Sequence, residues 1–212
     1  RIQVIDLKSV SVRTLPIEAR SNIACLALAA PLLVAVDVQN HALIVHFHRG
    51  IVLHRFKFKH KVRCLRFSPS SQYLAVGVGK LLQVWCMPNA TSARSFAPLQ
   101  LHRTYAGLVD DITDLCWSDD ESVILGASRD CSVRLWTLHT VPNYEPVTLS
   151  GHKTPIVGVY YFAATDTIYT ISSDGAAVTW ECKFSNDDIR VARDDDDMQI
   201  DEEAVNFFAG GE

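Results

Sequence analysis

The chain has 212 residues, a formal net charge of −4 and 48% hydrophobic residues, so it can bury a core and is not disordered overall. The charge is segregated: the stretch 38–109 has ten Lys and Arg and no acid, whereas 183–212 has ten acids and three bases. The six cysteines form no C-x-x-C pair, so we expect small buried thiols in a reducing compartment and no metal site. The longest uncharged apolar run, 23–36, is too short for a membrane helix and contains Pro31.

Short apolar runs with two-residue alternation, separated by turn residues, predict strands from the start of the chain. We expect the remainder of an earlier unit near 1–15 and a weak unit without tryptophan near 23–56. Three clearer units follow near 62–101, 112–149 and 156–182. Their third strands end at Trp85, Trp136 and close to Trp180, which are 51 and 44 residues apart. A repeat of this length, built from short strands, is typical of the blades of a propeller.

The pattern stops after Cys182. The final segment, 183–212, contains the acidic run RDDDDMQIDEE and has too little apolar content to fold alone. We expect a disordered, solvated loop or linker. The alternative is that it mimics nucleic acid or contacts a basic partner.

The dipeptide Gly151-His152 and an Asp six residues before a Trp, in units of four strands, resemble WD repeats. The resemblance implies an all-β fold, a partial WD40-type β-propeller of about four blades spanning residues 1–182. In that family a His, a Ser or Thr, the turn Asp and the Trp form a structural hydrogen-bonded network. The matching residues are His152, Ser172 (or Thr170), Asp174 and Trp180 in the last unit, Asp130 and Trp136 in the third, and Trp85 in the second. Gly107-Leu108 replaces the Gly-His pair in the third unit.

A Ser, a His and an Asp together could also indicate a hydrolase. We favour the structural interpretation, because an Asp in a tight turn and a buried Trp donor suit a network that satisfies buried polar groups. No nucleophile elbow, phosphate-binding loop or paired-acid motif occurs elsewhere. We therefore predict no enzymatic activity, no catalytic residue and no cofactor.

The segment 55–66, RFKFKHKVRCLR, is the strongest candidate binding surface. Its bases are spaced by two with Phe56 and Phe58 between them, so an extended backbone would place the bases on one side and the rings on the other. Such a row can neutralise several phosphates of RNA or contact an acidic partner. The alternative is a solvated edge whose lysines prevent aggregation. The candidate residues are Arg55, Lys57, Lys59, Lys61, Arg63 and Arg66.

The phrases RSFAPLQLHRTYAG and DITDLCWSDDESVILGASRD are more specific, and they resemble the periodic tryptophan protein 2 family. That resemblance implies a nucleolar, non-catalytic scaffold of the small-subunit processome, with tandem propellers of which this chain would be part of the first. Its expected partners are other WD-repeat scaffold proteins, precursor ribosomal RNA and the U3 small nucleolar ribonucleoprotein, with no membrane and no small-molecule substrate. The alternative is an adaptor in another complex, such as a ubiquitin ligase or a trafficking coat.

Overall fold

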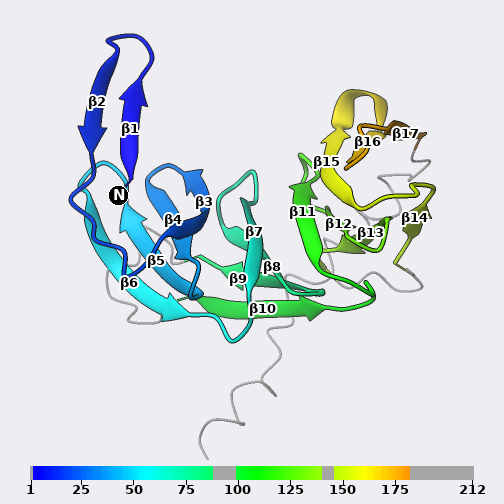
Figure 1. Ribbon diagram of the computed structural model, residues 1–212, viewed down its shortest axis with the longest axis horizontal. Coiled ribbons are helices and arrows are strands. Elements are labelled where there is room, and N and C mark those ends of the chain that lie inside the picture. The colour runs from blue at the N-terminus through cyan, green and yellow to red at the C-terminus, as the bar shows by residue number, and fades with distance from the viewer. Residues whose placement is uncertain (1, 88–98, 140–145, 182–212) are drawn as a thin grey trace, which may run out of the picture.

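The computed structural model describes residues 2–87, 99–139 and 146–181, which form five antiparallel sheets (Figure 1). An N-terminal hairpin pairs β1 (Gln3–Asp6) with β2 (Ser11–Thr14). Blade 1 contains β3 (Ile23–Ala29), β4 (Leu32–Asp37), β5 (His41–His46) and β6 (Ile51–Lys57), in that order. Blade 2 contains β7 (Val62–Phe67), β8 (Tyr73–Val78), β9 (Leu81–Cys86) and β10 (Gln100–Tyr105).

Blade 3 contains β11 (Ile112–Trp117), β12 (Val123–Ser128), β13 (Ser132–Thr137) and β14 (Thr148–Ser150). Blade 4 has three described strands, β15 (Ile156–Phe162), β16 (Thr167–Ser172) and β17 (Ala177–Glu181), with a single 3-10 turn, η1 (Ala163–Thr165), between the first two. Each blade is a meander, so sequence neighbours are also sheet neighbours. No helix in the described ranges is long and apolar enough to cross a membrane.

The blades follow one another along an arc (Figure 1). The first strand of each blade lies on the inner side, where β7 sits between β3 and β11, and β11 sits between β7 and β15. The outer strands β6 and β10 run along the outside of the arc. This is the arrangement of a partial WD-type β-propeller, as predicted.

Apolar side chains on both faces of blades 1, 2 and 3, and on one face of blade 4, hold the arc together. Strand alternation sends neighbouring residues to opposite faces, and the middle strands are apolar on both. In blade 1, Val34 and Ile44 pack towards blade 2, whereas Leu33 and Val45 pack towards the N-terminal hairpin. All four are essentially inaccessible to solvent. Each such side chain stabilises the fold by roughly 1.5–3 kcal/mol relative to exposure.

The turn between the second and third strands is built in the same way in every blade. A residue with positive φ occupies it: Asn40 at 67°, Gly79 at 59°, Cys131 at 67° and Gly175 at 85°. Glycine adopts this conformation freely and asparagine tolerates it, whereas a cysteine there is unusual. The turns are therefore similar in structure although their sequences differ.

One outer strand lies elsewhere than the sequence predicted. The sequence predicts that the second unit ends near residue 101, but β10 runs from Gln100 to Tyr105. The sequence QLHRTY was overlooked because an outer strand is half solvated and therefore mostly polar. Its anchor is Tyr105, whose hydroxyl donates to the Thr137 carbonyl at 2.8 Å and whose ring lies 5.9 Å from that of Trp136. The acidic segment 183–212 lies outside the described residues as well.

Candidate structural network and binding surface

Blade 4 brings together three of the four residues expected to form the WD-type network. The Thr170 hydroxyl contacts His152 Nε2 at 2.7 Å, accepts the Trp180 indole N–H at 3.0 Å and donates to the Val178 carbonyl at 3.3 Å. Which group donates in the contact between His152 and Thr170 depends on the imidazole tautomer. Thr170 is fully buried, so this contact ties the loop before β15 to the middle of the sheet.

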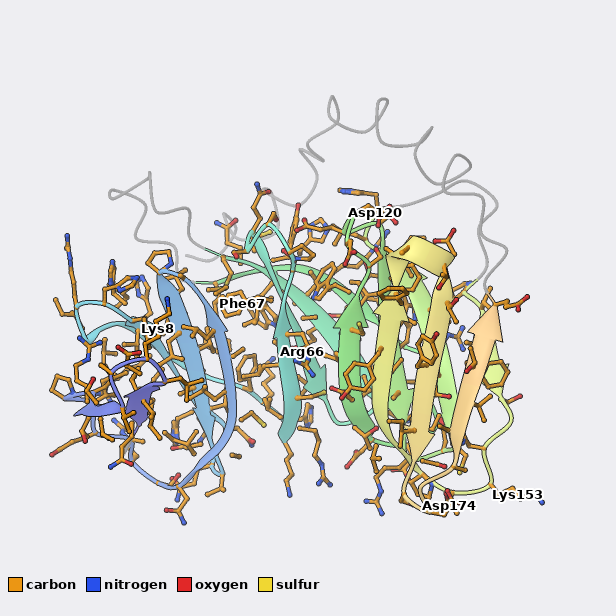
Figure 2. The ribbon with its side chains drawn as sticks, turned by 90° about the horizontal axis from the view of Figure 1, so that it is seen from above. Lys8, Arg66, Phe67, Asp120, Lys153 and Asp174 are labelled. Atoms are coloured by element: carbon orange, nitrogen blue, oxygen red, sulfur yellow. The ribbon has the colours of Figure 1, made fainter. Side chains whose placement is uncertain are left out.

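Ser172 and Asp174 form a separate local contact. The Ser172 hydroxyl donates to Asp174 Oδ1 at 2.6 Å, and the same oxygen accepts the Ala176 backbone N–H at 3.1 Å. The hydrogen bond from Ser172, then that from Ala176, lowers the pKa of Asp174. Asp174 therefore shapes the β16–β17 turn, and the hydroxyl that joins His152 to Trp180 is Thr170, not Ser172. Figure 2 shows Asp174 and Lys153 at the same end of the blade-4 strands.

This geometry argues against a hydrolase triad in blade 4. A triad requires a hydrogen bond between the nucleophile and the base, and another between the base and an orienting acid. Within the described ranges, His152 contacts Thr170 and makes no hydrogen bond with Ser172 or Asp174. The Thr170 hydroxyl is saturated by its three partners and is buried. It cannot reach a substrate.

Blade 3 replaces the missing histidine with backbone groups. The Asp130 carboxylate accepts the backbone N–H of Val109 at 2.8 Å and of Ser132 at 3.0 Å. Burial alone would raise the pKa of Asp130, but these bonds and those of the Ser132 and Ser128 hydroxyls hold it below its ordinary value. Leu108, in the histidine position, is buried among apolar side chains. The turn is thus tied to the preceding loop without an imidazole.

The two blade tryptophans without a histidine use their indole groups differently. The Trp136 N–H donates to the Ala106 carbonyl at 3.3 Å, again a contact with the preceding loop. Trp85 packs edge-on against Phe56 and Phe58, with ring centroids 5.1 and 5.8 Å away. Its indole N–H has no hydrogen-bond partner within the described ranges. In blade 2 the tryptophan therefore acts through aromatic packing.

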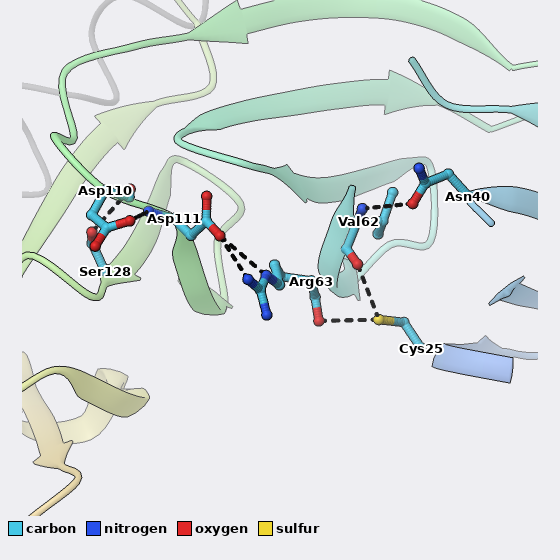
Figure 3. Close-up of polar contacts among 7 residues, drawn as sticks. All are labelled: Cys25, Asn40, Val62, Arg63, Asp110, Asp111 and Ser128. Carbon is cyan, nitrogen blue, oxygen red and sulfur yellow. Dashed lines mark hydrogen bonds and ion pairs between the residues drawn. The ribbon is translucent and has the colours of Figure 1, made fainter. Parts of the chain in front are cut away.

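Polar contacts also join the inner strands of neighbouring blades. Figure 3 shows Arg63 of β7 donating to Asp111 Oδ2 at 2.8 and 3.2 Å, while the Cys25 thiol of β3 contacts the Arg63 carbonyl at 3.0 Å. One step further, Arg66 Nε donates to the Leu115 carbonyl at 3.2 Å, and its guanidinium lies 3.5 Å from Asp114. Arg63 and Arg66 are therefore contacts between blades 2 and 3.

The prediction that the bases of 55–66 form one continuous row is therefore wrong. It assumed one extended segment, but β6 ends at Lys57 on the outside of the arc, and the chain then crosses to β7 on the inside. Arg55 and Lys57 are exposed on β6, Lys59 and Lys61 are exposed in the connecting loop, and Arg63 is paired with Asp111. Phe56 and Phe58 do point away from these bases, towards Trp85. A cationic surface remains at 55–61, without Arg63 and Arg66.

Some stabilising residues gave no sequence signal. Glu121, buried in the turn after β11, accepts hydrogen bonds from the Ser70 backbone N–H and, at 2.9 Å, from the Ser70 hydroxyl of blade 2. The Trp117 indole donates to the Arg66 carbonyl at 3.2 Å. Both contacts link residues 51 positions apart in sequence, and no local motif marks them.

The cysteines are structural. All five in the described ranges are free, and burial raises the pKa of the Cys25, Cys64, Cys86 and Cys116 thiols. A thiol with a raised pKa is a weak nucleophile and a poor metal ligand at neutral pH. No group of three or more His, Cys, Asp or Glu in the described part of the chain is arranged to hold a metal ion.

The chain is similar to WD-repeat proteins and to periodic tryptophan protein 2. The WD domain, G-beta repeat model matches 51–86 and 99–137; each match starts in or just before the outer strand of one blade and runs through the first three strands of the next. The chain is 39% identical over 183 residues to "Periodic tryptophan protein 2 homolog" of Schizosaccharomyces pombe, and 37% over 184 residues to "Periodic tryptophan protein 2" of Saccharomyces cerevisiae, with 85% of this chain covered in each case. It is 32% identical over 193 residues to the Mus musculus homologue, covering 90% of this chain.

These matches span only 21%, 20% and 21% of the respective relatives, so the chain corresponds to about a fifth of their length. Among solved structures, the computationally designed Ika4 protein is similar, with a TM-score of 0.63, 16% identity, and coverage of 77% of this chain and 93% of that one. At that identity the likeness concerns the fold alone.

The blade-4 contact around Thr170 can be tested by removing its hydroxyl. We expect Thr170→Val to lower the free energy of unfolding by about 1–3 kcal/mol, because it leaves the Trp180 N–H and the His152 Nε2 without a partner. The measurement is chemical denaturation. Thr179→Val, an exposed position in the same sheet, is the control and should change little. Equal effects of the two substitutions would contradict the network.

The Arg63–Asp111 pair can be tested by a double-mutant cycle with Arg63→Ala and Asp111→Ala. Both side chains are about one-third exposed, so solvent screens the pair. We expect a coupling energy of about 0.5–1 kcal/mol that shrinks as salt is raised. A coupling energy of zero at low salt would show that the pair does not stabilise the junction between blades 2 and 3.

Proposed function

Because the chain is a WD-repeat β-propeller protein that resembles periodic tryptophan protein 2 over most of its length, we propose that it acts as a non-catalytic scaffold in ribosome biogenesis. The observation that carries this proposal is the sequence identity of 32–39% across 85–90% of the chain, far beyond a single repeat. More specifically, we propose a role in the small-subunit processome, in the nucleolus, in processing of pre-18S ribosomal RNA.

The structure supports a scaffold through its stiffness. Adjacent blades share apolar cores and are also joined by polar contacts between their inner strands and turns. A rigid arc keeps the exposed loops of several blades at fixed separations, so different partners can bind it at the same time. The polar groups of blade 4 that might have suggested catalysis are used for its own folding.

The exposed cations of 55–61 are the proposed contact with RNA or with an acidic partner protein. Lys57, Lys59 and Lys61 are exposed and make no ion pair within the described ranges. They lie in the stretch 38–109, which contains no acidic residue. The partners that this proposal predicts are precursor ribosomal RNA, the U3 small nucleolar ribonucleoprotein and other WD-repeat scaffold proteins.

The lysine surface predicts a loss of binding without a loss of stability. We expect the combined substitutions Lys57→Glu, Lys59→Glu and Lys61→Glu to reduce crosslinking to precursor ribosomal RNA, or to loosen one assembly contact. The melting temperature should change little, because the three side chains are exposed. The control is charge reversal at Lys8, Arg49 and Lys153, which are exposed elsewhere. If crosslinking and co-purification both stay at wild-type levels, the surface has no binding role.

The processome assignment predicts which molecules accompany the protein. We expect the affinity-tagged full-length protein to co-purify at moderate salt with U3 small nucleolar RNA and precursor ribosomal RNA, and its depletion to lower the yield of 18S ribosomal RNA. RNA sequencing and mass spectrometry of the purified complex give the measurement. Recovery of a ubiquitin ligase or a trafficking coat, without either RNA, would establish the adaptor alternative instead.

A further inference from the structure

A small cavity lies at the edge of blade 1, next to the cationic surface 55–61, and shares Arg55 and Lys57 with it. Its volume is about 150 Å³, and it sits between the segment that leads from the N-terminal hairpin to β3 and the outer strands β5 and β6. Cavities for drug-sized ligands measure roughly 300–1,000 Å³, and one water takes about 30 Å³. The space therefore suits a small ion or a single chemical group. The side chains of its lining that carry charge or can carry it are Arg20, Asp37, His41, Arg55 and Lys57.

The register of β5 and β6 brings these groups together. His41 pairs with Lys57 and Leu43 pairs with Arg55, so all four side chains share one face of the sheet. Leu43 packs in the core that contains residues 15 and 17, so this face is directed at the segment that carries Arg20. Three bases from distant parts of the sequence thus line one cavity.

The cavity has a surplus of positive charge. Arg20, Arg55 and Lys57 make no ion pair or side-chain hydrogen bond within the described ranges, and Asp37 is the single carboxylate among the lining residues. The lining therefore contains three cationic side chains and one carboxylate. Glu18 lines a neighbouring cavity that also borders Arg55, so it limits the surplus on that side.

One oxygen of the Asp37 carboxylate is already occupied by the protein. It is 4% exposed, and its Oδ1 accepts the backbone N–H of Gln39 at 2.9 Å and of His41 at 2.8 Å. Burial would raise the pKa of Asp37, but the backbone hydrogen bonds from His41 and Gln39 hold it below its ordinary value. Its Oδ2 lies 3.4 Å from His41 Nδ1, and neither atom has a hydrogen-bond partner within the described ranges. Asp37 therefore orients the turn and His41, and leaves Arg20, Arg55 and Lys57 available to an external anion.

We propose that this cavity binds one phosphate group of single-stranded RNA, held by Arg20, Arg55 and Lys57. Two guanidinium groups can each donate two parallel hydrogen bonds to phosphate oxygens, and the ammonium adds a point charge. Lys59 and Lys61 continue the exposed cations beyond the cavity, where adjoining phosphates of the same strand would lie. These additional cations favour RNA over a phosphorylated peptide. The choice of RNA as the ligand rests on the proposed function, whereas the cavity and its charged lining are independent of that function.

The test compares binding by the purified full chain and by its Arg20→Gln/Arg55→Gln variant. The probes are a short single-stranded RNA, a phosphoserine peptide and inorganic phosphate, each measured by fluorescence or calorimetric titration. We expect RNA affinity to fall about tenfold in the variant, as charge-assisted hydrogen bonds are lost. Across a salt series, the log–log slope should shrink by about 0.7, the value for one phosphate of a single strand. The control is Arg49→Gln, which removes an exposed cation in the same blade but outside the cavity. It should leave the RNA affinity and the salt slope unchanged.

Unchanged RNA affinity and salt slope in the double variant would overturn the proposal. Tighter binding of the phosphoserine peptide than of RNA, lost in the variant, would overturn the assignment to RNA. If the double variant does not fold, as judged by its melting curve, Lys57→Gln gives the same comparison with a smaller expected loss. A chain that shows the expected loss in vitro but does not co-purify with ribosomal precursors would contradict the proposed function and not the phosphate site.

Discussion

The burial of two apolar faces in each of blades 1, 2 and 3 determines most of this structure. A four-stranded sheet such as blade 2 has apolar residues on both sides of its middle strands, so it is stable only between two neighbours. Val76 faces blade 1 and Ala75 faces blade 3, although they are adjacent in sequence. The positions of all exposed loops follow from this packing, because the blades cannot slide without separating these cores.

Polar contacts refine a geometry that the cores establish. The turn Asp is tied to the preceding loop in blade 3 by the Val109 backbone, while blade 4 ties its own loop through His152 and Thr170. Blade 2 uses aromatic packing around Trp85. Three chemically different solutions thus hold equivalent parts of successive blades. In each blade a different set of side chains makes the contact, so the position does not require one particular residue type.

The sequence predicted the strands of high alternation well, because an apolar run in a middle strand is buried on both faces. It predicted Trp136 and Asp130 as structural residues, because the spacing of six residues between them can be read directly from the sequence. It could not distinguish Thr170 from Ser172, because the two hydroxyls are separated by one strand period and lie on the same side. It placed β10 too early, and it joined Arg55 to Arg63 in one row, because the crossing between β6 and β7 leaves no change in composition. The cavity beside Arg20 depends on a contact between distant segments, which spacing does not encode.

The matched repeats and the blades are out of step by one strand: a repeat such as 51–86 begins with β6 of blade 1 and ends with β9 of blade 2. Each repeat therefore completes the sheet before it and relies on the next repeat to complete its own. A gene duplication that copies one whole repeat inserts an extra blade while leaving every other sheet with its full complement of strands. A duplication that copied one blade, by contrast, would give the same number of strands but split the loop that connects each outer strand to the following inner strand. The offset of one strand thus ties neighbouring blades together covalently, because each repeat contributes strands to two sheets.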